Sequence, residues 1–128
     1  MQPKLIQTEL AKYTPAVWTG KNESGYLPIG DMVLILTDQV ASSSSGGIKF
    51  PEDVVERLNM AAETGTIAAV GPGAFSWSHD RKRPFEGRKP SPGDYVFIER
   101  YAGQLISGKD GLKYRLMADK QVGAVRER

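Results

Sequence analysis

Hydrophobic residues gather in short runs along this chain, and turn-forming residues separate the runs. Met32 to Thr37 is an almost unbroken apolar run with β-branched members, which predicts a buried strand. Thr66 to Val70 and Tyr95 to Glu99 are similar runs, and Gln104 to Ile106 is a shorter one. Several short strands with turn signals between them are typical of a small β-barrel. The pattern therefore predicts a mostly β fold.

The C-terminal segment combines a hairpin signal with alternation. Asp110-Gly111 favours a tight two-residue turn. The alternation that follows predicts a half-buried strand, with Leu112, Tyr114 and Leu116 on one side and Lys113, Arg115 and Met117 on the other. Val122 to Val125 is a last short strand before a charged tail.

Two segments lack the period of a strand. Between residues 52 and 63, apolar residues recur at helical spacing, with Glu and Arg between them. A short helix is one interpretation of this segment, and a loop that orders only on binding is the other. Near the N-terminus, Thr8 is placed to cap a short helix that Pro15 would end. We interpret residues 1–27 as an N-terminal arm and residues 28–128 as one domain.

Composition narrows the possible classes of protein. The 128 residues are 40% hydrophobic and 25% charged, which suits one globular domain. The absence of cysteine excludes disulfides, thiolate metal sites and thiol nucleophiles. There is no apolar run of membrane-spanning length, and the first residues do not lead into the apolar core of a signal peptide. We therefore expect a cytoplasmic protein.

The charge is unevenly distributed although the net charge is only +2. Residues 31–62 carry five acidic and two basic residues, a net charge of −3, whereas residues 75–90 carry five basic and two acidic residues, a net charge of +3. The basic segment also contains Phe75, Trp77 and Phe85. Aromatic and basic residues together favour the hypothesis of a small β-barrel that binds nucleic acid. Because the basic residues are confined to one loop, nucleic-acid binding is the weaker hypothesis.

The sequence offers no catalytic or metal-binding constellation. His79 is the only histidine. Although Ser76 and Asp80 are near it in sequence, catalytic triads are assembled from separate elements of a fold. His79 and Asp80 alone would supply too few ligands for a metal. Gly71-Pro72-Gly73 is followed by no Gly-Lys-Ser/Thr, so it is not a phosphate-binding loop. Its two glycines are able to take positive φ at the end of a strand.

The stretch from Ser42 to Pro51 joins a polar tether to two large apolar residues. Four serines and two glycines cannot bury enough apolar surface to become ordered by themselves. In an extended conformation Ile48 and Phe50 would point to the same side, with Lys49 turned away. One interpretation is a surface loop whose apolar residues return to the core. The other is an apolar hook that docks into a groove on another protein.

Five segments in this order resemble the GroES-type co-chaperonins. Residues 31–35 resemble the first barrel strand, and residues 45–51 resemble the mobile loop, in which two glycines precede an apolar tripeptide. Residues 65–73 resemble the family's strand into the roof hairpin. Residues 92–97 and 101–103 resemble the strand after it and the turn beyond. Residues 110–116 and 122–125 resemble the C-terminal hairpin and its closing strand. The resemblance extends over about residues 28–126.

The resemblance implies a GroES-like β-barrel with a long mobile loop, about residues 38–64, and a roof loop, about residues 74–90. It also implies a homoheptameric ring that closes a GroEL-type chaperonin over an unfolded client. Because the partner hydrolyses ATP, the chain itself would be no enzyme and would need no cofactor or metal. The residues implied are Gly46, Gly47, Ile48, Lys49 and Phe50 for chaperonin binding, Val33, Val122, Ala124 and Val125 for the subunit interface, and Tyr101 facing the chamber. A half-buried aromatic residue in a turn is the alternative for Tyr101.

Several features depart from the family pattern. Lys49 occupies the usually apolar middle of the tripeptide. This leaves open the hypothesis of a scaffold protein that kept the fold and lost the partner. The segment after the tripeptide is longer, the roof loop is enlarged and basic, and the arm has no counterpart in short members. These departures indicate a divergent member, and a viral origin would place it in the host cytoplasm.

Overall fold

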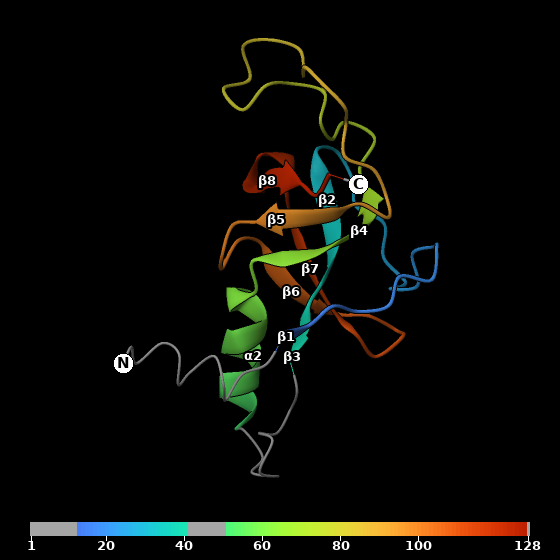
Figure 1. Cartoon of the computed structure of the whole chain (residues 1–128), viewed down its shortest axis with the longest axis vertical. Helices are drawn as coiled ribbons and strands as arrows, with labels where there is room; N and C mark the ends of the chain where they lie inside the picture. The colour runs from blue at the N-terminus through green and yellow to red at the C-terminus, as the bar shows by residue number, and fades with distance from the viewer. Residues whose placement is uncertain (1–12, 41–50, 128) are drawn as a thin grey trace.

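A computed structural model of the chain describes residues 13–40 and 51–127 (Figure 1). Their elements in chain order are β1 (Tyr13–Thr14), β2 (Met32–Thr37), β3 (Gln39–Val40), α2 (Glu52–Ala61), β4 (Thr64–Val70), β5 (Tyr95–Ile98), β6 (Gln104–Ser107), β7 (Lys113–Ala118), the 3-10 turn η1 (Asp119–Gln121) and β8 (Val122–Val125). Within this part of the chain, no helix has the length and apolarity to cross a membrane.

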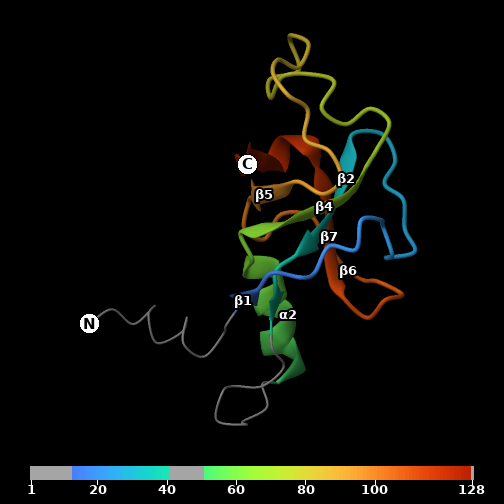
Figure 2. The ribbon, with the colours of Figure 1, turned by 45° about the vertical axis from the view of Figure 1, so that its right-hand side comes forward.

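Six strands form one antiparallel sheet in the order β6-β7-β2-β4-β5-β8. The sheet makes a small β-barrel, so the predicted mostly β fold class is confirmed. The central strand β2 has the bounds that its apolar run predicts, and it pairs with β4 on one side and β7 on the other. The roof loop rises beyond one end of the barrel, and α2 and β1 lie at the opposite end (Figures 1 and 2).

Both faces of β2 are buried, which explains why its apolar run is unbroken. Val33 and Ile35 point into a cluster inside the barrel. Leu34 and Leu36 belong to a second cluster on the other face, and Ala16 and Trp18 from the N-terminal segment pack against that cluster. Residues 15–31 run along the side of the barrel from β1 up to β2 (Figure 2). The described part of the arm is thus packed onto the barrel.

Replacing Trp18 with alanine should lower the free energy of unfolding by about 1–2 kcal/mol, less than the loss for a fully buried tryptophan. The substitution would uncover the second cluster, which includes Leu34 and Leu36. Urea unfolding measures this effect. Val17→Ala is a matched control, since Val17 is 82% exposed and should change stability by only a few tenths of a kcal/mol. Equal effects of the two substitutions would contradict the covering role of Trp18.

The structure decides between the two interpretations of residues 52–63 and tests part of the prediction near the N-terminus. Residues 52–61 form α2, whose first turn contains Glu52 and Asp53, where acidic side chains favour the helix dipole. The amides of Val54 and Val55 both donate to the Pro51 carbonyl at 3.1 Å, which begins the helix. Near the N-terminus, residues 13–14 form β1, so the helix expected before Pro15 does not include them. The rest of that prediction lies outside the described residues.

One detail of the sequence prediction was wrong. The second face of β7 was expected to meet water, yet Arg115 and Met117 are both 0% exposed. The barrel closes over this face as well, so alternation in sequence did not correspond to alternation in exposure. Neither Gly71 nor Gly73 adopts a positive φ. Gly71 is required for space instead, because a Cβ there would lie 2.4 Å from the Gly30 carbonyl oxygen.

Candidate functional site

The residues expected to bind a chaperonin, Gly46, Gly47, Ile48, Lys49 and Phe50, lie outside the described residues. The elements that precede and follow them are β3 and α2, which lie together at the end of the barrel opposite the roof loop (Figures 1 and 2). The interval assigned to the mobile loop, about residues 38–64, therefore contains regular structure at both of its ends. The geometry of these two ends determines where the loop begins and finishes.

The N-terminal end of this interval is held by buried polar contacts. Asp38 is buried, and its carboxylate accepts hydrogen bonds from the Thr64 hydroxyl and, at 2.7 Å, from the Tyr95 hydroxyl. Burial raises the pKa of Tyr95, which keeps this phenol a donor. The Gln39 amide group donates to the Lys113 carbonyl and accepts from the Lys113 amide, both at 3.0 Å. The chain is therefore fixed to β4, β5 and β7 by the residue before β3 and by the first residue of β3.

The C-terminal end of the interval is held by the guanidinium of Arg115. Arg115 donates to the carbonyl oxygens of Ala62 at 2.6 Å, Glu99 at 2.7 Å and Ala102 at 3.0 Å. Burial lowers the pKa of this guanidinium from its ordinary value. The carbonyls supply its hydrogen bonds in place of water. Arg115 thereby fastens the end of α2 to the turn between β5 and β6.

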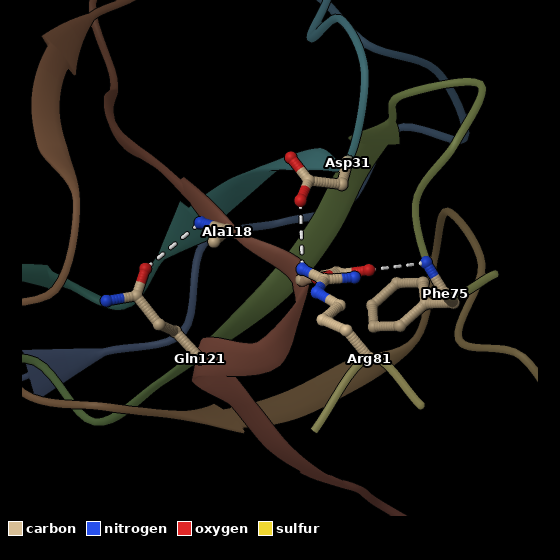
Figure 3. Close-up of polar contacts among 6 residues, drawn as sticks. Asp31, Phe75, Arg81, Ala118 and Gln121 are labelled. Carbon is tan, nitrogen blue, oxygen red and sulfur yellow. Dashed lines mark hydrogen bonds and ion pairs between the residues drawn. The ribbon is translucent and has the colours of Figure 1, made fainter. Parts of the chain in front are cut away.

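The base of the roof loop is held by a second polar cluster. Asp119 in η1 is almost fully buried and accepts from the Phe75 amide at 2.8 Å. Arg81 donates to the carboxylates of Asp119 and Asp31, each at 2.9 Å, so it reaches from the roof loop to the start of β2 (Figure 3). Phe75 has a φ of 56°, which a non-glycine residue adopts only when its surroundings hold it there.

The roof loop folds back on itself beyond this base. Trp77 and Pro84 form an isolated antiparallel bridge. The Ser78 amide donates to the Arg83 carbonyl at 2.7 Å. At the other end of the loop, Arg88 pairs with the buried carboxylate of Asp94 at 3.0 Å. The roof loop is thus a tied hairpin-like structure, with the Trp77 side chain exposed.

A groove of about 140 Å³ lies between the roof loop and β8. Phe75, Trp77 and Phe85 contribute to one wall, and Val122 and Val125 contribute to the other. In the described sheet β8 pairs with β5 alone, so its second edge carries no strand. An apolar groove next to a free strand edge is a surface suited to contact with another chain.

The residues expected at the subunit interface and in the chamber differ in how exposed they are. Val122 is buried, Ala124 is exposed and Val125 is half-buried along β8. Val33 is 0% exposed and its strand is paired on both sides, so Val33 has no free edge to offer a neighbouring subunit. The place of Val33 in the subunit interface stays a prediction. Tyr101 is 54% exposed in the turn after β5, so the chamber-facing role and the alternative of a half-buried aromatic residue in a turn both stay predictions.

A comparison with protein families decides the identity. A family model described as the chaperonin 10 Kd subunit matches residues 26–126. The chain belongs to the chaperonin 10 family. As a chaperonin 10 protein it is a GroES-like co-chaperonin, a class of chaperones that act in protein folding, and the family is not an enzyme family. The resemblance inferred from five segments of the sequence is therefore confirmed.

Individual chaperonin 10 relatives are divergent from this chain. The 20 kDa chloroplast chaperonin of Arabidopsis thaliana is 30% identical over 98 residues, which cover 77% of this chain and 36% of that protein. The co-chaperonins GroES of Mycolicibacterium vanbaalenii and Mycobacterium tuberculosis are each 26% identical over 98 residues, which cover 77% of this chain and 90% of theirs. The chain thus spans about a third of the chloroplast relative and most of the bacterial ones.

Sequence reasoning missed the residues that hold the two ends of the loop interval. Arg115 looked like a surface residue in an alternating strand, and nothing in its neighbours marks it as buried. Tyr13, whose pKa is raised by burial, donates from β1 to the Leu58 carbonyl of α2. The family pattern had no counterpart for the arm and so could not indicate this contact.

Proposed function

We propose that this chaperonin 10 protein is a ring-forming lid that binds a GroEL-type chaperonin through Ile48 and Phe50. The observation that carries the proposal is the family match together with the position of β3 and α2. These elements flank the apolar tripeptide in sequence, and they lie at the end of the barrel opposite the roof loop. A lid needs its partner-binding loops and its roof at opposite ends. An unfolded client would be enclosed between the lid and the chaperonin, which hydrolyses the ATP.

The energetics favour binding by many loops together. Burying Ile48 and Phe50 would contribute roughly 1.5–3 kcal/mol each. Ordering a loop backbone costs about 1–2 kcal/mol per residue, so one loop would bind weakly. A ring, a heptamer by family resemblance, makes the later contacts intramolecular and so raises the overall affinity. It also keeps the lid releasable, because a small change in the binding free energy at each groove is multiplied by the number of loops.

The proposed ring interface uses the free edge of β8. Val122, Ala124 and Val125 line or adjoin this edge, whereas Val33 does not. The complementary surface would be the segment before β2, where Leu27 is 81% exposed and Ile29 is 78% exposed. Two different surfaces that contact each other in successive subunits make a head-to-tail interface, which generates a ring when the rotation between subunits closes. Tyr101, exposed on the turn after β5, would face the chamber.

Replacing both Ile48 and Phe50 with serine should abolish chaperonin binding and leave the ring intact. Size-exclusion chromatography with light scattering tests this, first on the protein alone and then with a GroEL-type chaperonin and ADP. Lys49→Ser is a matched control in the same tripeptide, because it keeps both apolar side chains and should still co-elute with the chaperonin. Retained binding by the double variant would refute the hook. A wild-type protein that ignores the chaperonin would refute the lid function.

Nucleic-acid binding by the roof loop is less well supported. Of its basic residues, Arg81 and Arg88 are already paired with carboxylates of the same chain. Their charge is therefore partly neutralised and less available to phosphates. The roof loop suits a tied structural cap on the barrel better than a phosphate-binding surface.

A further inference from the structure

The N-terminal arm touches both ends of the chaperonin-binding loop. β1 pairs antiparallel with β3, with Tyr13 opposite Val40 and Thr14 opposite Gln39. β3 is the last described element before residues 41–50, so the arm adds a second strand where the loop begins. The Tyr13 hydroxyl also donates to the Leu58 carbonyl in α2, at 2.8 Å, which is on the other side of the loop.

The Tyr13 contact is one of several bonds that hold the end of α2. The last four carbonyls of a helix have no partner within it, and in α2 the amide of the C-cap residue Ala62 donates to the Asn59 carbonyl. The Met60 carbonyl accepts from the Tyr101 amide at 2.7 Å, and Ala62 is held by Arg115. These two bonds come from the barrel, whereas the bond to Leu58 comes from the arm. Leu58 is also the member of this set that lies nearest to the loop along the helix.

We propose that the N-terminal arm is a brace for the base of the chaperonin-binding loop, with Tyr13 as its positioning residue. This inference rests on the proposed function. By tying β3 to α2, the arm holds together the two elements that residues 41–50 connect, so less conformational freedom remains to be lost on binding. In a ring the same gain in binding free energy is repeated at every loop, and together these gains raise the overall affinity.

Two variants test the brace. Deleting residues 1–14 removes β1 but keeps Trp18 on the barrel, and we expect at least tenfold weaker chaperonin affinity with an unchanged number of subunits in the ring. Tyr13→Phe removes only the hydroxyl, and we expect at least threefold weaker affinity. Tyr26→Phe is the matched control, since Tyr26 is an exposed tyrosine of the same N-terminal segment and should bind as wild type. Affinity is measured for the assembled ring with a GroEL-type chaperonin and ADP.

A second readout separates the brace from the lid function. Amide hydrogen exchange in α2 should be faster in Tyr13→Phe than in wild type, because the end of the helix loses one of its bonds. Wild-type affinity or tighter binding in both variants, while the Ile48 and Phe50 double variant fails to bind, would overturn the brace alone. If wild type itself does not bind the chaperonin, the proposed function is overturned. Exchange in α2 then decides the brace, and equal rates in Tyr13→Phe and wild type would refute it.

Discussion

Replacing Arg115 with alanine should lower the free energy of unfolding by about 3–5 kcal/mol, the range found when a buried charged network loses one partner. The guanidinium is 0% exposed and donates to three backbone carbonyls from two parts of the chain. Removing it would leave these carbonyls buried without their donors, and each unsatisfied group costs about 1–3 kcal/mol. The alanine would also leave a cavity between α2 and the turn after β5.

Arg115→Lys should recover only part of this loss. Lysine has one ammonium group in place of a planar fork, so it cannot reach Ala62, Glu99 and Ala102 with the same geometry. Urea unfolding measures both variants. Arg100→Ala is the control, because Arg100 is exposed and its ion pair with Glu63, at 3.9 Å, should contribute less than about 1 kcal/mol. A loss for Arg115→Ala as small as for Arg100→Ala would contradict the structural role of Arg115.

The strands and their order along the chain could be predicted because local patterns indicate them. Met32–Thr37 and Val122–Val125 form strands with the bounds that their hydrophobic runs predict. The hairpin at Asp110-Gly111 also has the expected place between β6 and β7, although residues 108–112 form its connection in place of the expected two-residue turn. Each of these features depends on a few neighbouring residues and on turn chemistry. Five such segments in one order were enough to indicate the family.

The contacts that hold the loop and the roof could not be predicted, because they join residues far apart in sequence. Arg115 has the spacing of a surface residue, and only the closure of the barrel buries it. Tyr13 pairs with β3 and reaches α2, yet no local pattern relates the arm to either element. Arg81 looked like one of several solvated basic residues, whereas it pairs with Asp31 and Asp119. Polar side chains become specific only through partners that the fold supplies.

Replacing Asp119 with alanine should release the base of the roof loop and lower the free energy of unfolding by about 2–4 kcal/mol. A hydrogen bond to a charged group contributes about 1.5–3 kcal/mol, and the buried donor left without a partner adds to the loss. Asp119 accepts from the Phe75 amide and from Arg81. Without it, Phe75 would lose the bond that holds its positive φ, and Arg81 would keep only Asp31.

Limited proteolysis together with urea unfolding distinguishes release of the roof from general destabilisation. In Asp119→Ala, cleavage should begin within residues 75–88 under conditions in which the wild-type roof loop resists. Asp119→Asn keeps an oxygen for the Phe75 amide but loses the charge that faces Arg81, so it should lie between wild type and alanine. Glu86→Ala is the control, as an exposed acidic residue of the same loop. If the Asp119→Ala roof resisted cleavage like wild type, the φ of Phe75 and the position of the loop would have to be maintained by the contact between the Phe75 and Phe85 rings.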